Sequence, residues 1–184
     1  MGDQAVRRRL RRRRATGVPA EPKLLEIYLN DHLAGAAAGT ELARRLARTH
    51  QGTPAGPELA RLSTEIAEDR RTLRTMMTTL GVPVRRWMTL AGWLGEKLGR
   101  LKPNGRFLSR SPLSSVIELE IMRLGVEGKL SGWRLLRTVA DHDRRLDRER
   151  LDRLIERAER QSRLLEELWM RSVEDIIGVP EPTK

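Results

Sequence analysis

Apolar residues recur along this chain with the spacing of an α-helix, in long segments separated by stretches that contain proline and glycine. Residues three and four positions apart lie on the same side of a helix, so this spacing predicts helices with a buried side. The predicted helices span residues 22–49, 57–80, 112–140 and 146–177. Aromatic residues make up only 3% of the chain and β-branched runs are scarce, which also favours an all-α fold.

The segment 113–139 is apolar on more than one side. At helical spacing one stripe contains Leu113, Ile117, Ile121, Leu124, Leu135 and Val139, and a second contains Leu119, Met122, Val126, Leu130 and Trp133. Such a helix is expected to be covered on both sides. Residues 85–101 read as a shorter amphipathic helix that is positioned to supply one of the covers.

Connection lengths predict how the helices are joined. The loops after residues 49 and 140 are short, so each joins two antiparallel helices, whereas residues 81–112 are long enough to cross the bundle. The second and third long helices are then parallel, and the fold is a four-helix bundle with one long crossover. The bundle occupies residues 21–178, between an N-terminal arm of residues 1–20 and a flexible tail of residues 179–184.

The positive charge is concentrated at the N-terminus. The net charge is +11, and residues 1–20 have too few apolar side chains to fold. One interpretation of this disordered arm is a solvated tail. The other is a nucleic-acid anchor, in which phosphates are neutralised by Arg7, Arg8, Arg9, Arg11, Arg12, Arg13 and Arg14.

Several classes of function find no support in the residues. There is no cysteine for thiolate chemistry or disulfides, no phosphate-binding loop and no nucleophile elbow. No apolar run reaches the roughly 18–20 residues that span a bilayer, and no export signal follows the arginines. We therefore expect a cytoplasmic protein.

Polar residues on the inner sides of the predicted helices are the candidate site. Glu120 and Glu127 fall at the edge of the first stripe of the third helix, Asp69 lies inside the stripe of the second, and His32 flanks that of the first. A metal site drawn from these four residues, with a first shell of two carboxylates and one imidazole and an open position for water, is one hypothesis.

A hydrogen-bond network without metal is the alternative hypothesis, and it adds Tyr28, Asp31, Glu65 and Gln161. In this network Asp69 pairs with Arg70 or Arg123, Glu127 pairs with Gln161, and His32 pairs with Tyr28 or a carboxylate.

The predicted topology and the segment YLNDHLAGAAAG, residues 28–39, resemble the ferritin-like superfamily, in particular uncharacterised ferritin-like proteins of high-GC actinobacteria. The resemblance implies a di-iron centre built from two Glu and two Glu-x-x-His motifs. This chain has no Glu-x-x-His. The resemblance therefore implies a degenerate site and a non-catalytic binding or stress-associated protein without cofactor. We further expect a homodimer that forms through apolar helix faces. The alternatives are an oxidoreductase that binds iron or manganese, and a nucleic-acid-associated protein.

Overall fold

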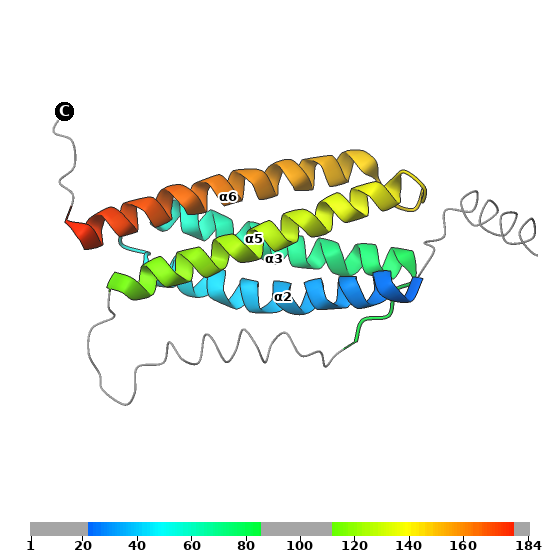
Figure 1. The fold of residues 1–184 in the computed structure, drawn as a ribbon, viewed down its shortest axis with the longest axis horizontal. Coiled ribbons are helices and arrows are strands. Elements are labelled where there is room, and N and C mark those ends of the chain that lie inside the picture. Colours follow the sequence, from blue (N-terminus) through cyan, green and yellow to red (C-terminus); the bar gives the residue numbers. More distant parts are fainter. Residues whose placement is uncertain (1–21, 86–111, 179–184) are drawn as a thin grey trace, which may run out of the picture.

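A computed structural model describes residues 22–85 and 112–178 of the chain. These residues form four α-helices and no strand, which confirms the all-α four-helix bundle (Figure 1). The helices are α2 (Pro22–Thr49), α3 (Gly56–Leu80), α5 (Pro112–Ala140) and α6 (Arg148–Ile177). The predicted N-terminal arm, the C-terminal tail and, beyond Arg85, the predicted amphipathic helix lie outside the described residues.

Local chemistry fixes the helix ends. Gly81 ends α3 because its φ of 74° is left-handed and its N–H points to the carbonyl oxygens of Met77 and Thr78. The carboxylate of Asp147 accepts a hydrogen bond from the backbone N–H of Arg150 and caps α6. This cap explains why α6 begins at Arg148, two residues after the predicted start.

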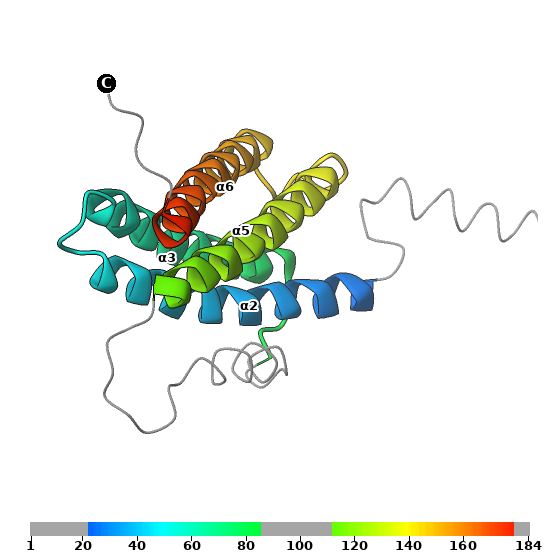
Figure 2. The same cartoon turned by 60° about the vertical axis from the view of Figure 1, so that its left-hand side comes forward.

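Cross-helix contacts give the directions of the helices. Arg45 of α2 pairs with Glu118 of α5 at 3.1 Å, and further back along α2 the ring of His32 meets the Gly128 carbonyl, so these helices are antiparallel. The α2–α3 hairpin packs against the α5–α6 hairpin, and α3 and α5 point the same way (Figures 1 and 2).

Asn30 of α2 holds the segment that follows α3 against the side of α2. Its amide nitrogen donates to the Pro83 carbonyl oxygen at 3.0 Å, and its amide oxygen accepts from the Arg85 backbone N–H at 2.7 Å. Arg85 also pairs with Glu26 at 2.6 Å. Arg85 therefore lies near the first turns of α2, at the opposite end of the bundle from the start of α5.

The apolar core consists of two clusters, one toward each end of the bundle. One cluster includes Leu29, Met77, Trp133, Leu136 and Leu151. The other includes Leu46, Leu62, Leu119, Val126 and Leu165. Between them, at the middle of the bundle, polar side chains take the inner positions of α3, α5 and α6.

The prediction that α5 is buried on two sides is only half right. The second stripe, from Leu119 to Trp133, is buried as predicted. In the first stripe, however, Leu113 is 54% exposed and Leu124 is 65% exposed. The second stripe thus faces the core, and Ile121 and Val139 of the first stripe pack at its margin. The prediction that Glu120 and Glu127 point into a packed interior is wrong, because both residues are exposed.

The ring of His32 in α2 lies close against the backbone of α5 at Gly132. A Cβ atom added to Gly132 would lie 2.9 Å from Cδ2 of the His32 ring, closer than real Cβ contacts. The ring is held in place there by a stacked Tyr28, with ring centroids 4.1 Å apart. Glycine at position 132 is therefore what lets the imidazole lie against the backbone of α5.

We predict that Gly132→Ala destabilises the fold by about 1–3 kcal/mol, because the added methyl group displaces a ring that is fixed on two sides. The matched control is Gly125→Ala on the same helix, where an added Cβ meets no atom within 4 Å. This control should stabilise the helix by up to about 1 kcal/mol. Urea denaturation followed by circular dichroism measures both, and equal effects of the two substitutions would contradict the close approach.

Candidate binding site between the helices

A buried carboxylate held by two cations lies at the middle of the bundle. Asp69 of α3 is only 1% exposed. Its Oδ2 accepts from Nζ of Lys129 in α5 at 2.6 Å, and its Oδ1 accepts from Nη2 of Arg157 in α6 at 2.5 Å. Because a buried charge needs a partner of opposite sign, this single residue joins three helices at one level.

Further hydrogen bonds extend the cluster. Lys129 also donates to the amide oxygen of Gln161, whose amide nitrogen donates to Glu65 at 2.7 Å. Arg157 reaches Glu68 at 3.0 Å. We call Glu65, Glu68, Asp69, Lys129, Arg157 and Gln161 the polar layer; it lies between the two apolar clusters.

Burial sets the electrostatics of Lys129. Removal from water lowers the pKa of its ammonium group below the ordinary lysine value, while the charge and hydrogen bond of Asp69 act in the opposite direction. The nearby charge of Arg157 lowers this pKa further. The polar layer therefore holds two cationic groups close together, and Asp69 is the group that makes this possible.

A cavity of about 420 Å³ adjoins the polar layer and is lined by α2, α3 and α5. It exists because glycines stand where side chains would otherwise fill the space. A Cβ atom added to Gly35, Gly125 or Gly128 would meet nothing within 4 Å. Alanines 36 and 38 of α2 and Gly39 continue this stripe of small residues along the wall.

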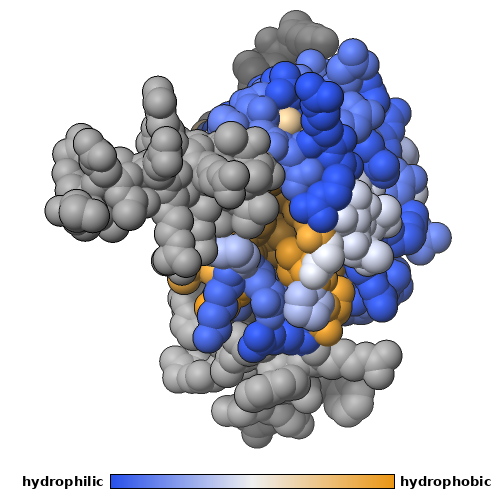
Figure 3. Space-filling view, turned by 90° about the vertical axis from the view of Figure 1, so that its right-hand side faces the viewer, coloured by the Kyte–Doolittle hydropathy of each residue, from blue (hydrophilic) through white to orange (hydrophobic). Residues whose placement is uncertain are grey.

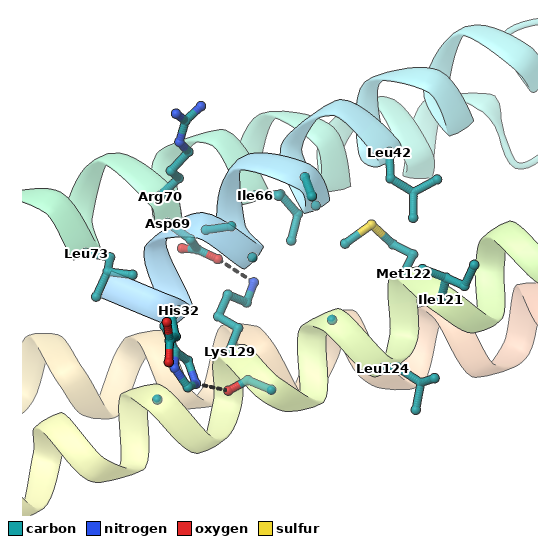
Figure 4. A pocket seen from close by; sticks show the side chains of 18 of the residues that line it. His32, Leu42, Ile66, Asp69, Arg70, Leu73, Ile121, Met122, Leu124 and Lys129 are labelled. Carbon is teal, nitrogen blue, oxygen red and sulfur yellow. Dashed lines mark hydrogen bonds and ion pairs between the residues drawn. The ribbon is translucent and has the colours of Figure 1, made fainter. Parts of the chain in front are cut away.

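The rest of the wall is mainly apolar, with polar groups toward one end (Figure 4). The apolar part of the wall is lined by Leu42, Ile66, Ile121 and Met122. The polar part contains His32, Asp69 and Lys129. The cavity also includes Leu124, which is 65% exposed, and it therefore reaches the surface.

Apolar residues are also visible from outside at one end of the bundle. Figure 3 shows apolar side chains in a strip between polar surfaces. Leu24, Ile27 and Val84, near the start of α2 and after the end of α3, are exposed by 61%, 40% and 37%.

The structure does not bring together the four residues predicted to bind a metal. Within residues 22–85 and 112–178, no group of three or more His, Asp or Glu side chains is arranged to hold a metal ion. Nδ1 of His32 lies 3.0 Å from the Tyr28 carbonyl oxygen, and Nε2 lies 3.1 Å from the Gly128 carbonyl oxygen. Each ring nitrogen therefore meets a backbone carbonyl and not a carboxylate. Asp69 is taken up by its two cations, and Glu120 and Glu127 lie outside the polar layer.

The predicted polar network is present in part, with other partners. Glu65 and Gln161 bond to each other, Tyr28 stacks on His32, and Asp31 lines the cavity. Two predicted pairings are wrong. Asp69 binds Lys129 and Arg157 and not Arg70 or Arg123, and Glu127 accepts from the hydroxyl of Ser162 and not from Gln161.

Glu68, Lys129 and Arg157 are the residues of the polar layer that sequence reasoning missed. A signal for Lys129 was available, because it lies three residues after Val126 and four before Trp133, both of which are buried. Arg157 similarly lies three residues after the buried Leu154 and four before Gln161. A long side chain at such a position reaches inward and needs an acidic partner.

No protein-family model, no curated protein and no solved structure matches the chain. In the part of the chain that the structure describes, none of the helices combines the length and the apolar character needed to cross a membrane. The polar layer and the cavity are therefore the features of the molecule that bear on its function.

We predict that Asp69→Ala destabilises the protein by about 3–5 kcal/mol, because it leaves Lys129 and Arg157 buried without their shared carboxylate. The matched control is Glu68→Ala on the same helix turn. Glu68 also binds Arg157, but its side chain is 45% exposed, so its loss should cost less than about 1 kcal/mol. Chemical denaturation of the two variants checks the difference, and a cost of Asp69→Ala as small as that of the control would contradict the role assigned to this carboxylate.

Proposed function

We propose that this chain is a non-catalytic binding protein that holds an apolar small molecule in the cavity between α2 and α5. The observation that carries the proposal is the cavity itself, whose volume of about 420 Å³ lies in the range of small-molecule sites. Its walls are mainly aliphatic, and the space is left by glycines on two facing helices. Burial of apolar surface is therefore the main source of affinity.

The polar layer supports a binding role over a metal-dependent one. We infer a ferritin-like arrangement, which is supported by the antiparallel hairpins and by the common direction of α3 and α5. In that superfamily the metals lie between the helices of the bundle core. Here Lys129 and Arg157 bring positive charge to the middle of the bundle and use both oxygens of Asp69. Because these two cations occupy the carboxylate of Asp69, it is not free to bind iron or manganese.

The remaining alternatives are still predictions. The arginines proposed to bind nucleic acid lie outside the described residues. A homodimer would use exposed apolar residues such as Leu113 and Leu124, of which Leu124 lies at the cavity. Occupation of this face by a second copy, or by residues 86–111 of the same chain, would compete with a small ligand.

We predict that the neutral dye N-phenyl-1-naphthylamine binds the intact protein with increased fluorescence, and that Gly35→Leu weakens this binding by about tenfold or more, equal to about 1.4 kcal/mol. A leucine at position 35 would enter open space inside the cavity and fill it. The control is Ala60→Leu, a similar enlargement at an exposed position of α3.

A fluorescence titration of the three proteins checks this prediction, with circular dichroism to confirm that each is folded. Absence of dye binding to the wild-type protein would refute the proposal, as would equal binding by the Gly35→Leu variant. Size-exclusion chromatography during the titration shows whether a second copy occupies the face, because dissociation of a dimer would then accompany binding.

A further inference from the structure

Exposed apolar side chains gather at the end of the bundle where α2 begins. Leu24 and Ile27 lie three residues apart, on one side of the first turns of α2, and the exposed Val84 follows α3. The two hydrogen bonds of Asn30 to the segment after α3 hold Val84 near the same turns. We call Leu24, Ile27 and Val84 the apolar patch. Figure 3 faces this end of the bundle and shows apolar side chains between hydrophilic ones.

Positive charge is in excess at the same end. Lys23 lies in the first turn of α2, Arg74 in the last two turns of α3 and Arg144 in the loop between α5 and α6. All three are exposed and have no acidic partner among the described residues. The loop lies against the end of α3, because Arg145 donates to the Thr79 carbonyl oxygen at 3.4 Å. Acidic residues at this end that pair with arginines are Glu26, Asp141, Asp143, Glu149 and Asp152.

The sequence that leads into α2 adds further positive charge. Residues 7–14 contain seven arginines, and α2 begins at Pro22. Arg14 lies eight residues before Pro22, and an extended chain spans at most about 3.6 Å per residue, so Arg14 is within about 29 Å of Pro22. The far end of α2, a helix of 28 residues, is about 42 Å away. The arginines nearest to α2 therefore add their charge to the half of the bundle that carries the apolar patch.

We propose that this end of the bundle binds the surface of an anionic lipid bilayer, with the apolar patch among the lipid chains and the basic residues at the headgroups. Apolar side chains with a polar rim mark surfaces of interaction. At a bilayer Leu24 and Ile27 leave water, while each basic residue near an anionic surface adds attraction. A nucleic acid would attract the same arginines, but its phosphates offer nothing to the three apolar side chains. The proposal goes beyond the proposed function and does not depend on the cavity.

The test is co-sedimentation of the full chain with phosphatidylcholine vesicles that either contain or lack phosphatidylglycerol. We expect binding to the anionic vesicles alone. Leu24→Gln combined with Ile27→Gln should weaken this binding by about tenfold or more, because glutamine keeps the net charge and removes the apolar side chains. The matched control is Met170→Gln combined with Ile177→Gln, which are 46% and 65% exposed toward the opposite end of the bundle. This control should bind as the wild-type protein does.

A second pair of variants measures the contribution of charge. Lys23→Gln combined with Arg144→Gln should weaken binding to the anionic vesicles by about tenfold. Arg163→Gln combined with Arg171→Gln removes the same charge from exposed positions in the second half of α6, away from the apolar patch, and should weaken binding by less than about threefold. Circular dichroism confirms that each variant is folded.

Three results would overturn the proposal. The first is absence of binding to the anionic vesicles, or binding that Leu24→Gln with Ile27→Gln weakens no more than its control. The second is loss of a dimer in size-exclusion chromatography when these two residues are replaced, because a second copy would then cover the apolar patch. The third is binding of double-stranded DNA by a protein that does not bind the vesicles, which would assign the basic residues to nucleic acid.

Discussion

The carboxylate of Asp69 between Lys129 and Arg157 is the interaction on which the arrangement of the bundle depends. Apolar side chains can slide past one another at little cost, but a buried charge has few positions in which it is satisfied. Asp69 comes from α3, Lys129 from α5 and Arg157 from α6, so their pairing fixes the relative height of three helices. It also divides the apolar core into two clusters, because the middle level of these helices is used by polar groups.

The remaining helix, α2, is held differently, and the cavity results from this difference. Among the residues of the polar layer none comes from α2, whose side toward the cavity includes the small residues Gly35, Ala36, Ala38 and Gly39. The tight contact is that of the His32 ring against Gly132, while one and two turns away Gly35 and Gly125 leave open space. The cavity therefore has one wall fixed by the ion pairs of Asp69, and another, α2, held by the His32 ring, by the pair of Arg45 with Glu118 and by core leucines. Such walls are formed before a ligand arrives, which lowers the entropy lost on binding.

The fold was largely predictable because helical period, prolines and capping residues act over a few residues and are visible in the sequence. The candidate site was predictable only in part. Asp69 and Gln161 were recognised as inward-facing, but their partners depend on how α5 is rotated. Because α5 has two apolar stripes, periodicity does not decide which one is buried. The first stripe makes Glu120 and Glu127 the candidate site residues of this helix, whereas burial of the second stripe brings Lys129 inward. The cavity was not predictable, because it depends on how closely two glycine-containing helices approach.

The position of the cavity beside the polar layer would link the proposed ligand binding to the stability of the bundle. A molecule that fills the space displaces water from the side of Lys129 that faces the cavity, and the attraction between Lys129 and Asp69 strengthens as the surroundings become less polar. The same molecule adds contacts between α2 and α5, where the described helices pack through small residues. A ligand that binds only the folded chain stabilises it by mass action. Glycines lower the stability of these helices, and a ligand bound beside them would restore part of that stability.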